Sequence, residues 1–202
     1  MAKEGTGTQA VVKSSPVAAG SRLVIWDGDK VGGGQGWADC TKKPGCKSAL
    51  TKTQGVGVDG STALKFHGEG TDWIGAGWNW ANYDPASGGT DISQYTTLTF
   101  QIRVESGAGG AAMDPSSLSV LLGCVKDKKD SADLSVQQYV KDFADGNWHK
   151  VVIPIGELTK GKGGAFDLKS AWQFVFTTWS AAPRTFTIYV DQIAAEKEPA
   201  SG

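Results

Sequence analysis

Acidic side chains end one apolar stretch near each terminus of the chain. Asp27 and Asp29 follow the apolar run 23–26, and Asp191 interrupts the apolar residues of the run 186–193. A carboxylate among apolar neighbours is costly to bury unless something pairs with it. If the two stretches form adjacent strands, their carboxylates face each other and suit a cation such as calcium, which prefers oxygen ligands. The pattern therefore predicts a structural calcium between Asp27, Asp29 and Asp191.

Side chains suited to catalysis are few. The two histidines, His67 and His149, have no Ser or Cys in a nucleophile-like turn beside them. A glycosidase would need two carboxylates a few ångströms apart across a cleft. The pairs that could be imagined are supported only by closeness in the chain: Glu69 with Asp72, and Asp84 with Asp91. We therefore expect that the protein is not an enzyme.

The chain's 3 cysteines leave little room for metal chemistry. Cys40 and Cys46 flank a segment whose Pro44-Gly45 pair is a turn signal, which could bring the two sulfurs together in a disulfide. Such a bond would indicate an oxidising compartment, whereas a reduced pair would favour the cytoplasm. Cys124 lies in an apolar run and is typical of a buried free thiol. The cysteines are too few and too irregularly spaced for a structural zinc site.

The elements that must position these groups are short strands. Apolar and polar residues alternate in several runs, most clearly where Leu98, Phe100 and Ile102 share one side. Turn-forming segments separate the runs, and no amphipathic helix is evident. The predicted strands are 22–27, 61–67, 72–80, 95–105, 118–125, 134–140, 148–155, 171–179 and 186–193. About nine short strands indicate an all-β fold, an antiparallel β-sandwich or jelly roll.

The segment between the first two predicted strands has a different composition. Residues 32–36 are nearly all glycine, but no Gly-Lys-Ser/Thr ending and no helix pattern follow them. A phosphate-binding loop is therefore not indicated. We expect a surface loop here, followed by an excursion from the core between Cys40 and Cys46.

Composition narrows the class of partner. The chain has 202 residues, enough for one domain, and its 20 basic and 21 acidic residues leave a formal charge of −1. This balance supplies no basic groove for nucleic acid. No apolar run is long enough for membrane insertion, and the N-terminal residues lack the apolar core of a signal peptide. That fits an intracellular protein, or a secreted one whose leader is not present in this chain.

One predicted domain is flanked by two tails. Residues 1–20 are small and polar and are typical of a flexible tail or linker. Residues 21–197 hold all the predicted strands and form the β-jelly-roll domain. Residues 198–202 form a second, short flexible tail.

Four segments in a particular order carry a family resemblance. They are 23–27, 91–100, 148–155 and 189–193. In this order and spacing the chain resembles the calcium-binding β-jelly-roll carbohydrate-binding modules with the galactose-binding-like fold. The resemblance implies a structural calcium between the terminal strands, with Asp191 as one ligand. It also implies a carbohydrate partner, a secreted or cell-surface location, and other modules of a larger protein, since such modules are appended to bacterial glycan-degrading enzymes.

A sugar site needs an exposed aromatic ring beside planar hydrogen-bonding side chains, because a sugar has an apolar C–H face and a rim of hydroxyls. Trp73 and Trp78 fall on opposite faces of one predicted strand, so we expect at least one exposed tryptophan. Gln101 and Arg103 face away from the core and would suit a concave sheet surface. The candidate ligand-binding residues are Trp73, Trp78, Trp80, Asn79, Tyr83, Gln101, Arg103 and Trp179.

Two functions from different classes fit these observations. The first is a non-catalytic carbohydrate-binding module that recognises a poly- or oligosaccharide through sheet-face aromatics. The alternative is a structural or adhesive β-sandwich that makes protein–protein contacts on a cell surface or in an assembly, and an intracellular assembly factor is a weaker third. Exposed tryptophans ringed by amides favour sugar, whereas a flat apolar patch favours a protein partner.

Overall fold

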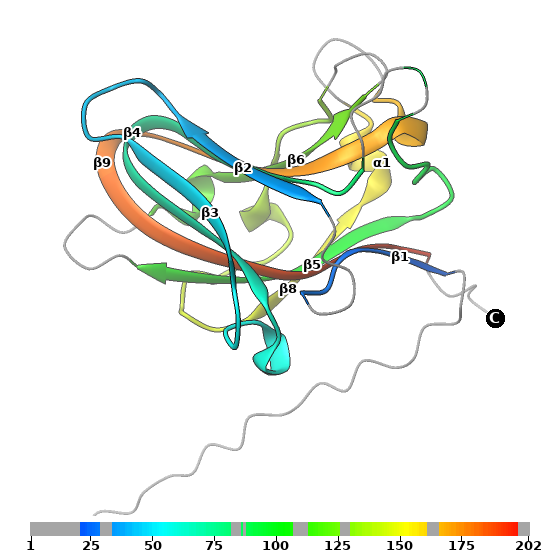
Figure 1. Cartoon of the computed structure of the whole chain (residues 1–202), viewed down its shortest axis with the longest axis horizontal. Coiled ribbons are helices and arrows are strands. Elements are labelled where there is room, and N and C mark those ends of the chain that lie inside the picture. The colour runs from blue at the N-terminus through cyan, green and yellow to red at the C-terminus, as the bar shows by residue number, and fades with distance from the viewer. Residues whose placement is uncertain are drawn as a thin grey trace, which may run out of the picture.

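The computed structural model of the chain describes most residues from 21 to 197 (Figure 1). The described residues are 21–28, 34–81, 86, 88–106, 113–125, 130–160 and 166–197. The predicted tails 1–20 and 198–202 lie outside them, and so do Asp29 and Tyr83. The predictions for these residues stay predictions.

Regular structure in the described residues is almost entirely β-strand. The strands are β1 (Arg22–Trp26), β2 (Gln35–Cys40), β3 (Lys47–Thr53), β4 (Ala63–Asn79), β5 (Thr97–Ser106), β6 (Leu118–Cys124), β7 (Leu134–Ser135), β8 (His149–Pro154) and β9 (Ala171–Glu196). The helical segments are single turns: α1 (Ile155–Leu158), η1 (Val58–Gly60), η2 (Pro115–Ser117), η3 (Val136–Gln138) and η4 (Leu168–Ser170). No helix within the described ranges is long and apolar enough to cross a membrane.

The strands form two layers, and the long strands β4 and β9 belong to both. Residues 72–79 of β4 pair with β2 and with residues 173–180 of β9, which in turn pair with β6. We call this set, with β7, the upper layer. The first part of β4 and the last part of β9 pair with each other and, with β3, β5 and β8, form the lower layer. Figure 1 shows β9 turning from beside β6, where it is orange, to beside β5, where it is red.

A buried arginine holds the bend between the layers. The register of β4 is irregular between Gly70 and Asp72, and Asp72 has a positive φ of 61°. Arg184 of β9 is 3% exposed, and its guanidinium donates to the carbonyls of Gly70 (3.3 Å) and Asp72 (2.8 Å) and to the hydroxyl of Thr178. Burial lowers the pKa of Arg184 from its usual value. The arginine thereby ties both long strands where they pass from one layer to the other.

Apolar side chains from both layers meet in the core. Successive residues of a strand point to opposite faces, so the even-numbered residues 74–78 of β4 and 174–178 of β9 turn inward. Phe100 of the lower layer contacts Phe174 and Phe176 of the upper layer, at ring-centroid distances of 5.2 and 5.7 Å. Two layers that share one apolar core form a β-sandwich, which confirms the predicted fold class.

The two terminal strands lie side by side, as the sequence predicts. β1 pairs with the end of β9 in an antiparallel register that matches Val24 with Ala194 and Trp26 with Ile193. The register carries Asp27, the next residue of the chain, toward the part of β9 that holds Asp191.

β2 and β3 were not predicted. They occupy the stretch expected to be a glycine-rich loop and an excursion from the core. Each pairs with β4 alone, and none of its residues is fully buried. They therefore carry little of the apolar alternation by which buried strands are recognised. Cys40 and Cys46 form a disulfide across the loop that joins them, with their Cα atoms 6.3 Å apart.

Four predicted strands are in fact two. Runs 61–67 and 72–80 belong to β4, and runs 171–179 and 186–193 belong to β9. The glycine and proline signals between the paired runs mark bends rather than strand ends, because a bulge tolerates residues that a regular ladder does not. The predicted strand 134–140 is also shorter, since β7 gives way to η3.

Candidate functional site

The outward side of the upper layer carries a row of tryptophans, and we call it the tryptophan face. Trp73 of β4 lies opposite Trp179 of β9, and Trp37 of β2 lies opposite Gly77 of β4. These positions alternate with the inward residues that fill the core, so all three side chains leave the sheet on the same side.

Glycines beneath two of the rings allow them to lie on the sheet. A Cβ atom at Gly77 would be 2.5 Å from Nε1 of Trp37, and one at Gly75 would collide with the ring of Trp73. Any other residue at these glycines would therefore occupy the space that the indoles fill. Trp37 and Trp73 are half-buried as a result, with one side against the backbone.

Trp179 extends the row beyond the two glycines. Its residue surface is 60% exposed, although it is a large aromatic side chain. With Trp37 and Trp73 it forms an apolar strip across β2, β4 and β9. Rings of this kind can stack against the C–H face of a sugar.

Hydrogen-bonding side chains border the strip. Gln35, Asn79 and Gln173 occupy matched positions of β2, β4 and β9 at one end of it. The Nε1–H of Trp37 donates to Oε1 of Gln173 (3.2 Å), and Oδ1 of Asn79 is buried without a hydrogen-bond partner among the described residues. Hydroxyls continue the border at matched positions of β9, β6 and β7: Thr177, Ser119 and Ser135. Amides and hydroxyls can exchange hydrogen bonds with sugar hydroxyls.

The disulfide loop lies at the other end of the strip. The N–H of Thr41 donates to the carbonyl of Trp73 (3.2 Å), and Nζ of Lys43 lies 2.6 Å from Oδ2 of Asp72. The hydrogen bond from Lys43 lowers the pKa of the Asp72 carboxyl from its usual value. These contacts fasten the loop that Cys40 and Cys46 close beside Trp73.

Trp78 and Trp80 do not join this row. Trp78 is 3% exposed and packs edge-on against Trp26, with ring centroids 4.8 Å apart. The alternation of β4 turns Trp78 into the core, which corrects the expectation that it is an exposed platform. Trp80 is half-buried against the core, and its Nε1–H donates to the hydroxyl of Thr90 (3.1 Å).

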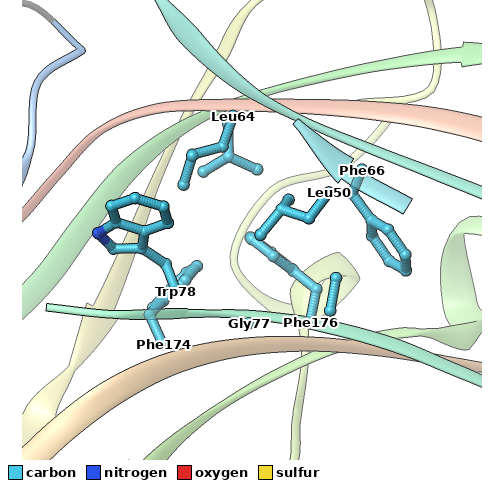
Figure 2. Close-up of a pocket in the computed structure, with 9 residues that line it drawn as sticks. Leu50, Leu64, Phe66, Gly77, Trp78, Phe174 and Phe176 are labelled. Carbon is cyan, nitrogen blue, oxygen red and sulfur yellow. The ribbon is translucent and has the colours of Figure 1, made fainter. Parts of the chain in front are cut away.

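Trp78 instead lines a small cavity within the core (Figure 2). The cavity measures about 10 Å³ and has an almost entirely apolar lining, which consists of Leu50, Leu64, Phe66, Ala76, Gly77, Trp78, Phe174, Phe176 and Val190. A volume of this size holds about one water molecule. The cavity therefore offers neither the room nor the polar groups that a sugar needs.

Gln101 and Arg103 lie on the opposite side of the sandwich, on the outward side of the lower layer. We call this side the charged face. The guanidinium of Arg103 lies over the rings of Tyr189 (4.4 Å) and Trp148 (5.3 Å), and its Nη2 is 3.3 Å from a carboxyl oxygen of Glu105. The predicted ligand-binding residues are therefore divided between two faces and do not form one site.

Protein donors surround the carboxylate of Asp191, which is fully buried. Its Oδ2 accepts hydrogen bonds from the N–H of Val58 (2.9 Å) and the hydroxyl of Ser61, and its Oδ1 accepts from the N–H of Gln192 (2.8 Å). Calcium requires several oxygen ligands instead. Within the described ranges no group of three or more His, Cys, Asp or Glu residues is placed to hold a metal. Asp29 lies outside the described part of the chain, so the predicted calcium stays a prediction.

Both carboxyls of one pair considered for catalysis, Glu69 and Asp72, have lowered pKa values. Hydrogen bonds from Lys47 and Lys43 lower the pKa values of Glu69 and Asp72, respectively, from their usual values. The general acid of a glycosidase needs the opposite shift, because it must carry a proton near neutral pH. Of the second pair, Asp84 lies outside the described residues.

The sequence prediction left out two residues of the tryptophan face, Trp37 and Gln173. Trp37 was assigned to the end of a loop, although Trp37 and Asp39 alternate there with Ala38. Gln173 alternates with the inward Phe174, which should have placed it on the outward side of a strand. The contact between Trp37 and Gln173 could not be predicted from a local pattern, because it joins β2 to β9 across β4.

A family comparison connects this face with a class of ligand. The profile of the family Carbohydrate binding domain 30 matches residues 22–197, nearly the whole described part of the chain. The chain belongs to the Carbohydrate binding domain 30 family. The chain is therefore a carbohydrate-binding module, and carbohydrate is the class of ligand that the sequence predicts.

Solved structures agree with the fold of this carbohydrate-binding domain. The family 30 carbohydrate-binding module of a cellulosomal cellulase of Clostridium thermocellum is 21% identical, covers 88% of this chain and 98% of its own, and gives a TM-score of 0.62. The family 11 module from Clostridium thermocellum, in complex with a β-1,3-1,4-mixed-linked tetrasaccharide, is 14% identical over 89% of this chain and 98% of its own, with a TM-score of 0.56.

A β-1,2-glucanase from Parabacteroides distasonis is similar as well. It is 18% identical, with a TM-score of 0.64, and the match covers 87% of this chain but 25% of the glucanase. At such identities the likeness shows the fold alone. No curated protein sequence matches the chain.

Proposed function

We propose that the chain is a non-catalytic module that holds a glycan on the tryptophan face. The observation that carries this proposal is the row of Trp37, Trp73 and Trp179, whose rings lie beside amides and hydroxyls on one open sheet surface. Stacking on the rings would supply affinity, and the polar border would orient the sugar.

A neutral β-linked glucan is the glycan class that we propose. The two glycines beneath Trp37 and Trp73 are two residues apart in β4, about 7 Å along the strand, so the strip suits an extended chain. Asp39 of β2 is exposed and lies opposite Gly75, where it would repel an anionic polysaccharide. The complex of the family 11 module with a mixed-linked tetrasaccharide supports this choice of ligand.

The module would work in a secreted or cell-surface protein that carries catalysis elsewhere. The disulfide between Cys40 and Cys46 supports an oxidising compartment. The origin of the family 30 neighbour in a cellulosomal cellulase supports the attachment to other modules.

Isothermal titration calorimetry with three soluble polymers tests the proposal: a β-1,3-1,4-mixed-linked glucan, a β-1,2-glucan and polygalacturonate. We expect binding to at least one glucan, no binding to the polyuronate, and loss of binding in Trp73→Ala. A reducing-end assay on the same mixtures should show no release of sugar. Glucan binding that survives in both Trp37→Ala and Trp73→Ala would refute the assignment to this face.

Protein binding is the second candidate, because an exposed Trp179 would also suit an adhesive contact. The amides and hydroxyls beside the strip favour sugar, because a protein partner that covered them would have to supply a new hydrogen-bond partner for each. If no polymer binds and Trp179→Ala abolishes a concentration-dependent association in sedimentation velocity, the adhesive function replaces the first proposal.

The structural calcium stays a separate proposal. The pairing of β1 with β9 supports it, since Asp27 follows directly on the pair Trp26–Ile193. Asp191, in contrast, is already hydrogen-bonded to the turn at Val58. Thermal melts with calcium and with EDTA test the ion, because a ligand that binds only the folded state raises the Tm. A calcium-dependent rise that is lost in Asp27→Asn supports the site, and identical melts reject it.

A further inference from the structure

Trp37 is held across the sheet by a residue two strands away. Its strand, β2, pairs with β4, and Gln173 belongs to β9, on the far side of β4. The Nε1–H of Trp37 nevertheless donates to Oε1 of Gln173 at 3.2 Å. The indole must therefore extend over the backbone of β4 to reach its acceptor.

Two glycines make this reach possible. Gly77 lies under the indole, and a Cβ atom there would be 2.5 Å from Nε1 and 2.6 Å from Cε2 of Trp37. Gly123 of β6 lies under the side chain of Gln173, and a Cβ atom there would collide with its Nε2. The hydrogen bond between Trp37 and Gln173 therefore depends on the absence of a side chain at Gly77 and at Gly123.

The hydrogen bond to Gln173 favours one orientation of the Trp37 ring. Without it, an indole on β2 could rotate about χ1 and χ2 to other rotamers and stand away from the sheet. With it, the ring is fixed flat over Gly77, in the orientation that an aromatic platform requires. Fixing the ring before the ligand arrives also removes part of the entropy cost of binding.

We propose that Gln173 is a positioning residue of the tryptophan face, which holds Trp37 flat over Gly77 with space provided by Gly123. The proposal rests on the proposed glycan-binding function of this face. In this role Gln173 acts through Trp37, separately from any hydrogen bond that its own amide makes with the sugar. The second tryptophan, Trp73, needs no such tether, because its ring lies over Gly75 of its own strand.

The first test is spectroscopic and needs no glycan. In a ¹H–¹⁵N NMR spectrum, the indole N–H signal that is missing in Trp37→Phe identifies Trp37. In Gln173→Leu, which keeps the size but removes the acceptor, we expect this signal to shift and its hydrogen exchange to accelerate about tenfold or more. Gln173→Glu keeps an acceptor oxygen and should preserve the signal near its original position.

The second test is calorimetry with the β-1,3-1,4-mixed-linked glucan. Gln173→Leu should weaken binding by roughly tenfold, the order expected for loss of one partly buried hydrogen bond, and Gln173→Glu should restore most of it. Gly77→Ala should lift the ring and weaken binding similarly. Gly156→Ala is the matched control, because a Cβ atom at Gly156 meets no atom within 4 Å, and it should bind as the wild type does.

The outcomes separate the two proposals. If the wild type binds no glucan but Gln173→Leu still releases the Trp37 indole, the proposed function fails and the positioning of the ring stands. If Gln173→Leu leaves the Trp37 signal unchanged, the positioning role is wrong, whether or not glucan binding falls. Normal circular dichroism and Tm of Gln173→Leu are required for either reading, and Gln173→Glu supplies the same comparison if the leucine variant does not fold.

Discussion

The two outward faces of the sandwich differ in what lies against their aromatic rings. On the tryptophan face, Trp37 and Trp73 lie on glycines, and no longer side chain is interposed between ring and backbone. On the charged face, Tyr189 is 7% exposed, because Arg103 stacks on its ring at 4.4 Å and Lys65 lies over it at 5.9 Å. The charged face thus covers Tyr189, whereas Trp179 of the tryptophan face is 60% exposed.

The difference arises within the same two strands. β4 carries glycines at positions 75 and 77 of the upper layer, but Lys65, His67 and Glu69 at the outward positions of the lower layer. Long charged side chains next to a ring compete with any ligand for its surface, whereas glycines do not. The burial of Tyr189 also raises the pKa of its hydroxyl, as expected for a side chain held away from water. An aromatic residue on a sheet surface is therefore a platform only where its neighbours leave it open.

Trp73→Ala should cause the largest difference in glucan binding between the two faces. Removing a central ring should weaken glucan binding by roughly 10- to 100-fold, the range typical of an interface hot spot. The matched control is Trp148→Ala on the charged face, which should leave the Kd unchanged. Calorimetry on both variants measures the two effects, and an equal loss of affinity in both would remove the distinction between the faces.

Trp179→Ala should have a smaller effect. The ring is mostly exposed and contributes little to the core, so we expect the Tm to stay within about a degree of the wild type. Affinity for glucan should fall by roughly three- to tenfold, since one stacking contact at the end of the strip is lost. A Tm that drops by several degrees would show that Trp179 serves the fold instead.

Arg103→Met should affect stability and not binding. The change removes a cation that stacks on Tyr189 and Trp148, so we expect a loss of about 1 kcal/mol in the free energy of unfolding. Urea denaturation measures this loss, and calorimetry should give an unchanged Kd for glucan. A weaker Kd with normal stability would assign the ligand to the charged face.

The smallest effects concern one ion pair at the edge of each face, Lys43–Asp72 and Lys47–Glu69. Hydrogen bonds from the lysines lower the pKa values of both carboxyls. A depressed pKa in the folded state contributes stability above the ordinary carboxyl pKa, and this contribution is lost as the pH falls through the lower, folded value.

The Tm differences between the wild type and Lys43→Met or Lys47→Met should therefore be constant from about pH 5 to pH 8 and shrink as the pH falls below about 4 and passes through the folded pKa values. Thermal melts across this range measure both differences. Only Lys43→Met should also alter glucan affinity, by about twofold or less, because its loop is bonded to Trp73. A Tm difference that persists in acid would mean that the lysines stabilise the fold through their aliphatic stems.

Much of the fold follows from local pattern. The alternation from Leu98 to Val104 places a strand and its inward side correctly, because period-two patterning is a property of a single strand. The same logic places Trp73 and Trp78 on opposite sides of β4. It does not say which side is the core, since that depends on what packs against each side.

The candidate site was only partly predictable for the same reason. Trp73 and Trp179 were recognised as candidates, but Gln101 and Arg103 were joined with them, although they face the other way in space. The bend of β4 and β9 at Arg184 separates the two faces, and the hydrogen bonds from Arg184 to β4 connect residues more than 100 positions apart in the chain.

An all-β sandwich with neighbouring terminal strands, and an excess of tryptophans of which some had to be exposed, could be predicted from the amino-acid sequence. These predictions rest on side-chain period, composition and the order of the strands. The sequence could not show which tryptophans form a platform. That choice depends on Gly77 lying under a ring from β2 and on Gln173 of β9 receiving its N–H, and such contacts exist only after distant strands have paired.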